Sequence, residues 1–414
     1  AISALERLHE KNQKKSNTHV PVPTHKSKLA YVSPLPPERS GISGYSAVLL
    51  PELSKFYNIE VIVAQDEISD LWITSNCVIR DVEWFRAHAN DYDRVIYHFG
   101  NSPFHQHMFG LLEEFPGVVV LHDFYMSGVI AYMDVHGIEP NVWTKALYES
   151  HGYMAVHDRF DAVDKSKIIF KYPCNHNILR DSLGIIVHSD YSKHLAQHWF
   201  ARSNPNDWIK IPLLRPPVGD YDRSNVREAL SFKPTDFLIC SFGLLDPTKL
   251  NDRLLDSWLA SDLAKNENCF LVFVGENHGG EYGQQLVTTI KRSGIKKRIV
   301  ITGWIDDQTF HQYLVAADIS VQLRTLSRGE TSATALDCMN YGLPTIVNAN
   351  GSMAELPPDT VIKLQDDFKS NDLIEALENL WKDTQLRQEI GRNASEYVRK
   401  NNAPNVCANR IIKL

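Results

Sequence analysis

The sequence predicts an α/β protein made of two Rossmann-like domains, each built on a parallel β-sheet, that face a central cleft. Three observations predict this fold class. Short apolar segments alternate with segments of helical periodicity, which is typical of parallel strands covered by helices on both faces. The alternation stops in a segment rich in Pro, Asp and Asn, at 202–225, and then starts again. The 414 residues also exceed the length that one ordinary core organises.

In the first half of the chain, the segments that we interpret as strands lie at 29–33, 59–64, 94–99, 117–123 and 183–189. Helical segments lie between them, for example at 43–57 and 102–115. Nearly continuous apolar character is expected for a parallel strand that is buried on both faces. The first 27 residues are polar and lack this pattern, so we interpret them as a linker or peripheral arm.

The second half repeats the pattern. Its predicted strands lie at 237–243, 269–275, 298–304, 319–324 and 344–348. Its predicted helices lie at 251–264, 282–293, 307–318 and 331–341, and the last forty or so residues also have a helical pattern.

The predicted domain organisation follows from these elements. We expect an arm at 1–27, an N-terminal domain at 28–215, a C-terminal domain at 216–395 and a final helix at 396–414 that packs back on the N-terminal domain. Ligands of such sheets bind at the carboxyl ends of the strands, so the predicted site is the cleft between the domains.

Composition narrows the class of protein. A net charge of −7 argues against a general nucleic-acid binder. The six cysteines have no C-x-x-C spacing, which argues against a zinc site or disulfide framework and favours a reducing cytoplasm. We find no apolar run of about 18 residues and no signal peptide, so we expect no membrane span. Because the chain starts at Ala1, we expect a processed chain or part of a longer polypeptide.

The segment LRTLSRGETSATALDCMNYGLPTIV, at 323–347, carries charges between two apolar runs. Thr331 and Ser332 are good helix caps, and Gly342 with Pro344 ends the helix, which predicts a short helix at 331–341. A helix N-terminus at the end of a strand is a place for phosphate, because its first N–H groups are free and the helix dipole is positive there.

Charged residues surround this predicted phosphate site. Arg324 and Arg328 add positive charge, and arginine suits bidentate contact with phosphate. Glu330 and Asp337 are seven residues apart and can hydrogen-bond hydroxyls on either side of the phosphate. A sugar–diphosphate–ribose ligand has this pattern. The alternative is a solvated helix start with incidental charges.

The loop ERSGISGYS, at 38–46, follows the first predicted strand. Gly41 and Gly44 allow a diphosphate or an acceptor to approach the backbone closely. The loop does not match G-x-G-x-x-G or G-x-S-x-G, which disfavours dinucleotide-dependent redox chemistry and a hydrolase elbow.

Several blocks of this sequence resemble those of the retaining glycosyltransferases with a GT-B-type fold (family four), which include many bacterial mannosyl- and glucosyltransferases. ALDCMNYGLPTIV is similar to that family's LEAMACGLPVI block, and FGLLDPTKLNDRLLDSW to its GRLDPEKG block. PLPPERSGISGYS together with VVLHD resembles a subgroup found in O-antigen and exopolysaccharide assembly. The resemblance covers roughly 28–414.

The resemblance implies roles for single residues. Lys249 matches the family's diphosphate-binding lysine, whereas the neighbouring family arginine is Leu244 here. Either Arg324 or Arg253 is expected to replace that arginine's charge. The predicted donor site contains Lys249, Arg253, Arg324, Gly41, Gly44, Thr331 and Ser332.

Three further matches concern the sugar and the ribose. Asp337 matches the second carboxylate of the family's E-x7-E pair, which binds the ribose, but the first position is Gly329 and Glu330 comes one residue later. Either a rearranged loop presents Glu330 to the donor sugar, as we favour, or that contact is lost. His122 matches the N-domain histidine beside the donor sugar. The predicted catalytic residues are His122, Glu330 and Lys249.

Metal-dependent chemistry is not expected, and no cofactor is implied. The D-x-D matches at 91–93 and 220–222 lie before a strand and in the interdomain segment, so chance surface turns explain them. The group His98, Asn101, His105 and His107 is interpreted as polar contacts at the cleft edge and not as a metal site.

The predicted function is retaining transfer of a hexose from a nucleotide sugar, GDP- or UDP-linked with GDP-mannose preferred, to a glycan or lipid-linked glycan of a bacterial surface polysaccharide. Lipopolysaccharide O-antigen is an example. We expect a cytoplasmic protein, with the inner face of the membrane as the alternative location. Aromatic residues at 124–180, among Lys165, Lys167 and Lys171, are interpreted either as ordinary helices or as a surface for acceptor and membrane headgroups. The alternative functions are a non-catalytic sugar-nucleotide-binding module and a same-fold epimerase.

Overall fold

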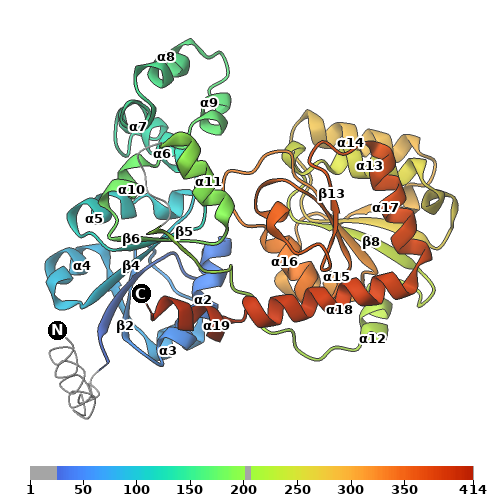
Figure 1. The fold of residues 1–414 in the computed structure, drawn as a ribbon, viewed down its shortest axis with the longest axis horizontal. Helices are drawn as coiled ribbons and strands as arrows, with labels where there is room; N and C mark the ends of the chain where they lie inside the picture. Colours follow the sequence, from blue (N-terminus) through green and yellow to red (C-terminus); the bar gives the residue numbers. More distant parts are fainter. Residues whose placement is uncertain (1–25, 201–206, 414) are drawn as a thin grey trace, which may run out of the picture.

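The computed structural model describes residues 26–200 and 207–413, which form two α/β domains (Figure 1). The predicted arm at 1–27 therefore lies outside the described residues except for Lys26 and Ser27, and the predicted interdomain segment at 202–225 is described from Asp207 onward.

The N-terminal domain is built on a parallel sheet with the strand order β3-β2-β1-β4-β5-β6-β7. Its strands are β1 (Lys28–Val32), β2 (Asn58–Val63), β3 (Val78–Asp81), β4 (Arg94–Phe99), β5 (Val118–Leu121), β6 (Gly184–Val187) and β7 (Ile209–Lys210). The sheet is covered by helices on both faces, so its central strands are buried, as their apolar sequences require.

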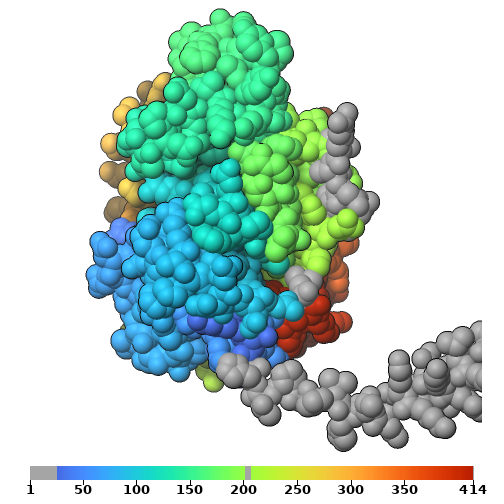
Figure 2. Space-filling view, turned by 90° about the vertical axis from the view of Figure 1, so that its left-hand side faces the viewer, coloured from blue at the N-terminus to red at the C-terminus, as the bar shows by residue number. Residues whose placement is uncertain are grey.

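The helices of this domain are α2 (Gly41–Leu53), α3 (Leu71–Asn76), α4 (Val82–His88), α5 (Met108–Glu114), α6 (Ser127–Val135), α7 (Val142–His151), α8 (Tyr153–Asp161), α9 (Ser166–Lys171), α10 (His176–Asp181) and α11 (Asp190–Trp199). Helices α6 to α10 are inserted between β5 and β6. Helices α7, α8 and α9 stand away from the sheet and form a protruding lobe (Figures 1 and 2).

The C-terminal domain has the strand order β10-β9-β8-β11-β12-β13, again parallel. Its strands are β8 (Phe237–Phe242), β9 (Cys269–Val274), β10 (Ile299–Ile301), β11 (Ile319–Gln322), β12 (Thr345–Asn348) and β13 (Ile362–Leu364). Its helices are α12 (Arg223–Ala229), α13 (Asn251–Ala260), α14 (Glu281–Arg292), α15 (Asp307–Ala316), α16 (Ala333–Asn340) and α17 (Ser370–Lys382).

Two chain crossings join the domains. The first is the segment after β7. The second is α18 (Thr384–Asn401), which leads to α19 (Pro404–Ile411), and α19 packs on α2 of the N-terminal domain (Figure 1). Asn402 ties the crossings together, because its carbonyl accepts a hydrogen bond from Arg215 N at 2.8 Å and its Nδ2 donates to Leu213 O at 2.8 Å.

The predicted fold class is confirmed, including both parallel sheets. Three strands were missed: β3, β7 and β13. Strand β3 is largely exposed and β7 has two residues, so neither forms the apolar run by which strands were recognised. In the two D-x-D segments, Asp93 accepts a hydrogen bond from Lys28 N and Asp222 caps α12. Among the described residues, no helix has both the length and the apolar character needed to cross a membrane.

Candidate functional site

The carboxyl edges of the two sheets meet at the loop between β11 and α16. The backbone carbonyl of Arg328 in this loop accepts hydrogen bonds from Phe124 N and Tyr125 N of the N-terminal domain, at 3.0 and 3.1 Å. Gly329 has φ +91°, and a Cβ there would lie 2.3 Å from Phe124 Cβ. Only glycine permits this close approach, so the loop is shaped by its contact with the opposite domain.

Lys249 projects into this site from the turn after β8. Asp246 caps the turn by accepting a hydrogen bond from Thr248 N at 2.9 Å. The Lys249 amine lies over Gly243, where a Cβ would be 2.7 Å from Nζ. Burial, together with the nearby Arg324, lowers the pKa of Lys249 to about 8. Within 26–200 and 207–413, no carboxylate lies within ion-pair distance of this amine, which leaves it available to an anion.

Glu330 and Arg324 lie beside Lys249. Glu330 Oε2 accepts a hydrogen bond from Arg328 N at 2.7 Å, and its Oε1 is 3.8 Å from Arg324 Nη1. Arg324 is fixed through its backbone, whose N–H donates to Asn348 Oδ1 at 2.8 Å. The structure therefore brings the displaced carboxylate, one arginine and the lysine together.

The N-terminus of α16 borders the same cluster. Ser332 is its N-cap, and the Ser332 hydroxyl accepts a hydrogen bond from Ala335 N at 3.3 Å. The neighbouring Thr331 Oγ1 is buried and has no partner among the described atoms. This hydroxyl and the first N–H groups of the helix are therefore potential donors to a phosphate.

Arg253 does not join the site. Its guanidinium stacks 3.7 Å from the centre of the Phe368 ring and donates to the Phe368 carbonyl. Of the two arginines expected to compensate for Leu244, only Arg324 lies beside Lys249.

Asp337 pairs with a residue that the sequence did not suggest. Its Oδ1 lies 2.8 Å from Nε of Arg215, which belongs to the first interdomain crossing. Burial raises the pKa of Asp337, and Arg215 and His311 oppose the rise. The residue predicted to bind the ribose thus forms an ion pair with the first interdomain crossing.

Gly41 and Gly44 lie in the first turn of α2, which Ser40 caps. A Cβ at either glycine would meet nothing within 4 Å, so packing does not require glycine there and the backbone is open to approach. The preceding Arg39 reaches across the interface, with its guanidinium 5.0 Å from the centre of the Trp304 ring.

His122 follows β5, but its ring is not free. His122 Nε2 lies 3.1 Å from His98 Nδ1, and His122 Nδ1 lies 3.0 Å from His188 Nε2. Both ring nitrogens therefore have histidine partners, and the role of His122 beside the donor sugar stays a prediction. His98 likewise belongs to this buried chain and not to the cleft edge. No group of three His, Cys, Asp or Glu side chains suited to a metal occurs in the described part of the chain.

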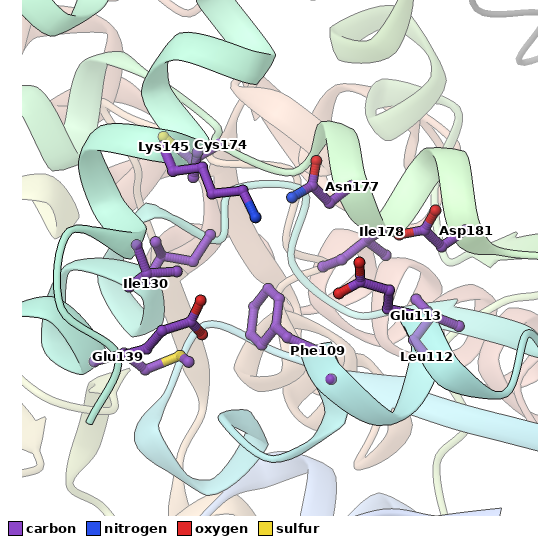
Figure 3. Close-up of a pocket in the computed structure, with 14 residues that line it drawn as sticks. Phe109, Leu112, Glu113, Ile130, Glu139, Lys145, Cys174, Asn177, Ile178 and Asp181 are labelled. Atoms are coloured by element: carbon purple, nitrogen blue, oxygen red, sulfur yellow. The ribbon is translucent and has the colours of Figure 1, made fainter.

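A separate cavity of about 90 Å³ lies within the N-terminal domain, between α5, α6, α7 and α10 (Figure 3). The side chains of Glu113, Glu139 and Asp181 surround it, with Lys145 as the single basic group. These carboxylates would repel a diphosphate, so this cavity is unsuited to the donor.

Some residues of the interface escaped the sequence analysis. His188 was missed, because only the register of β4, β5 and β6 shows that His98, His122 and His188 lie on one face of neighbouring strands. Asp123 was overlooked although it directly follows His122. No local signal marks the Arg39–Trp304 contact, since it joins two domains.

Two opposed Rossmann-like domains with a cationic site between their carboxyl edges are the architecture of the GT-B fold. The comparisons agree. Residues 222–397 match the family model described as Glycosyl transferases group 1. The match lies within the C-terminal half of the chain, and the chain as a whole has the GT-B fold.

Solved structures similar to the chain span both domains. HepE from Anabaena, solved with UDP and glucose, has a TM-score of 0.65 and 16% identity over 94% of this chain and 98% of its own. Sucrose-phosphate synthase from Thermosynechococcus elongatus has a TM-score of 0.64 and 14% identity over 94% and 98%. WaaG, a glycosyltransferase involved in lipopolysaccharide biosynthesis, has a TM-score of 0.61 and 14% identity over 92% and 99%. The comparison with curated protein sequences gave no match.

Proposed function

We propose that this protein is a retaining glycosyltransferase that moves a hexose from a nucleotide sugar to a growing bacterial surface glycan without using a metal. The observation that carries the proposal is the largely buried amine of Lys249, which lies beside Arg324 and forms no ion pair with any residue that the structure describes. A buried cation without a partner is costly, and a donor diphosphate would supply the missing charge.

The proposed reaction needs no enzymic nucleophile. The acceptor hydroxyl attacks the anomeric carbon on the face from which the diphosphate leaves, and the new bond forms there as the bond to phosphate breaks. Because the new bond forms on the face that the leaving group occupied, the configuration is retained, and the hydroxyl proton passes to the departing phosphate oxygen. Lys249, Arg324 and the N-terminus of α16 stabilise the charge that develops on the leaving group.

GDP-mannose is the preferred donor because of the family resemblance. HepE was solved with UDP-glucose, so UDP-linked donors belong in the same test. The acceptor proposed is a glycan or lipid-linked glycan, and the description of WaaG supports a surface polysaccharide.

We also propose that the lobe of α7 to α9 contacts the membrane or lipid-linked acceptor. Its exposed apolar and aromatic residues support this: Tyr148, Tyr153, Met154, Phe160 and Val163. Of the three lysines predicted to help, Lys171 is paired with Asp158 and Lys165 donates to backbone carbonyls, so apolar contact is the main contribution.

Co-sedimentation with phospholipid vesicles tests the role of the lobe. Met154→Asp should weaken binding, whereas Leu183→Asp, an exposed apolar residue that precedes β6, should leave it unchanged. Equal binding by both variants and the wild type would exclude this role.

The activity itself is tested with a panel of GDP- and UDP-linked sugars, by measuring donor hydrolysis, transfer and the anomeric configuration of the product. A product of retained configuration is expected. Binding without turnover would support the non-catalytic module, and conversion of the donor sugar without transfer would support an epimerase.

A further inference from the structure

Three histidines form a buried chain at the carboxyl ends of neighbouring strands. His98 Nδ1 lies 3.1 Å from His122 Nε2, and His122 Nδ1 lies 3.0 Å from His188 Nε2. His188 Nδ1 lies 2.8 Å from the carbonyl oxygen of Ile211. Tyr45 covers the central ring edge-on, with centroids 4.8 Å apart.

The direction of this chain is fixed by its last member. A carbonyl oxygen only accepts, so His188 Nδ1 carries a proton and donates it to Ile211. His188 Nε2 then accepts from His122 Nδ1, and His122 Nε2 accepts from His98 Nδ1. This order holds for neutral rings, and burial lowers the pKa of all three imidazoles below the ordinary value.

The chain leaves His122 with no nitrogen for a substrate. Its Nδ1 donates to one histidine and its Nε2 accepts from another. A sugar hydroxyl could reach the ring only by breaking one of these buried hydrogen bonds. The polar group that this strand end offers to the interface must therefore be another one.

Asp123, the next residue, has a carboxylate that can accept a hydrogen bond from a substrate. Its Oδ2 accepts a hydrogen bond from Asn101 N at 2.9 Å, which fixes the carboxylate. No lysine, arginine or histidine of the described chain forms an ion pair with it. The pKa of Asp123 is influenced by three charged residues across the interface: Arg324, Arg328 and Glu330.

The protonation state of Asp123 suits a hydrogen-bond acceptor. Burial, with a smaller effect of Glu330, raises the pKa of the carboxyl group to about 6, although the hydrogen bond from Asn101 N opposes the rise. The group is therefore mainly ionised at neutral pH. An ionised carboxylate accepts hydrogen bonds from hydroxyls and repels phosphate, so it matches a sugar alcohol and not the donor diphosphate.

We propose that Asp123, and not His122, is the residue of the N-terminal domain that binds the attacking hydroxyl of the acceptor. This inference rests on the proposed function and assigns its acceptor subsite. Asp123 holds the hydroxyl by accepting its hydrogen bond and orients the oxygen toward the anomeric carbon. The proton still leaves to the departing phosphate, so Asp123 is neither nucleophile nor final base.

Asp123→Asn tests the assignment in the full-length protein. The amide keeps the size and can still accept from Asn101 N, but it binds a hydroxyl more weakly than a carboxylate does. Transfer to acceptor, as kcat/KM for the acceptor, should fall on the order of 100-fold. Hydrolysis of the nucleotide sugar without acceptor, and affinity for the nucleoside diphosphate, should remain at the wild-type level.

Glu113→Gln is the matched control, because Glu113 is an exposed carboxylate of the same domain, at the cavity of Figure 3. It should leave both reactions unchanged. Nitrogen NMR of the histidine rings provides a second measurement, in which His122 should be neutral and protonated at Nδ1 in the wild type and in Asp123→Asn.

Three results would overturn the assignment. The first is wild-type transfer by Asp123→Asn. The second is an equal loss of hydrolysis and transfer, which would place Asp123 in the donor site or the fold. The third is His122 protonated at Nε2, which would free the ring for substrate. A wild-type protein inert toward every donor would instead refute the proposed function, and this inference with it.

Discussion

Lys249 carries a charge in surroundings that disfavour it. Its amine is buried, it faces Arg324, and burial lowers its pKa to about 8. Such an environment stabilises the charged amine poorly. A bound diphosphate would interact strongly with this amine, because the site has a low dielectric constant.

Nucleotide affinity should depend on pH through Lys249. A diphosphate binds the protonated amine, whose population falls as the pH rises through about 8. Affinity for GDP or UDP should fall by up to about tenfold per pH unit above that pH. Calorimetric titration at several pH values measures this.

Lys249→Arg keeps the charge at all these pH values and should remove the alkaline decline. Lys249→Ala should fold normally, bind weakly throughout and lose most transfer. Turnover near the wild-type level in Lys249→Ala would exclude a diphosphate contact for this residue.

Glu330 should matter more for transfer than for nucleotide binding, because the bare nucleotide lacks the sugar that this carboxylate is proposed to orient. Glu330→Gln should lower turnover on the order of 100-fold and leave affinity for GDP or UDP unchanged. The glutamine can still accept from Arg328 N, so the loop should keep its shape. Glu281→Gln, in the first turn of α14, serves as the control. Normal transfer by Glu330→Gln would mean that the displaced carboxylate has no such role.

At the scale of elements, the loop between β11 and α16 belongs to both domains. It supplies Glu330 to the site while its backbone carbonyls at Arg328 and Gly329 accept hydrogen bonds from the N-terminal domain. Ser192 Oγ donates to the Gly329 carbonyl at 2.9 Å. The position of the glutamate is therefore coupled to closure of the domains.

Gly329→Ala should separate the domains, since the new Cβ would meet Phe124 and the backbone is left-handed. We expect a loss of about 1–3 kcal/mol from the closed state, a larger radius of gyration in X-ray scattering and reduced transfer. Gly294→Ala has a similar backbone, with φ +76°, but open space around it, so it should change stability without opening the protein. Identical scattering from Gly329→Ala and the wild type would show that this contact does not hold the domains together.

At the scale of the whole molecule, the fold could be predicted because its strands are nearly continuous apolar runs. Strand β8 is buried at all six positions, which is what the letters FLICSF imply. The helix at α16 could also be predicted, because Ser332 and Gly342 act through local backbone geometry. The short strand β7 could not, since it has two exposed residues.

The site was less predictable, because its partners come from distant segments. No sequence pattern near these residues indicates that Asp337 pairs with Arg215 or that Arg253 stacks on Phe368. The cationic cluster could be anticipated, since Lys249 and Arg324 each follow a strand of the same parallel sheet. The partners of His122 depend on strand register, which the sequence does not state.

The donor diphosphate is proposed to bind between the domains at Lys249, and the proposed mechanism depends on this contact. A crystal structure of the protein with bound GDP or UDP tests it most directly. We expect phosphate oxygens within hydrogen-bonding distance of Lys249 Nζ and of the first N–H groups of α16, with Arg324 on the same group. A diphosphate bound elsewhere, with the Lys249 amine still unpaired, would contradict it.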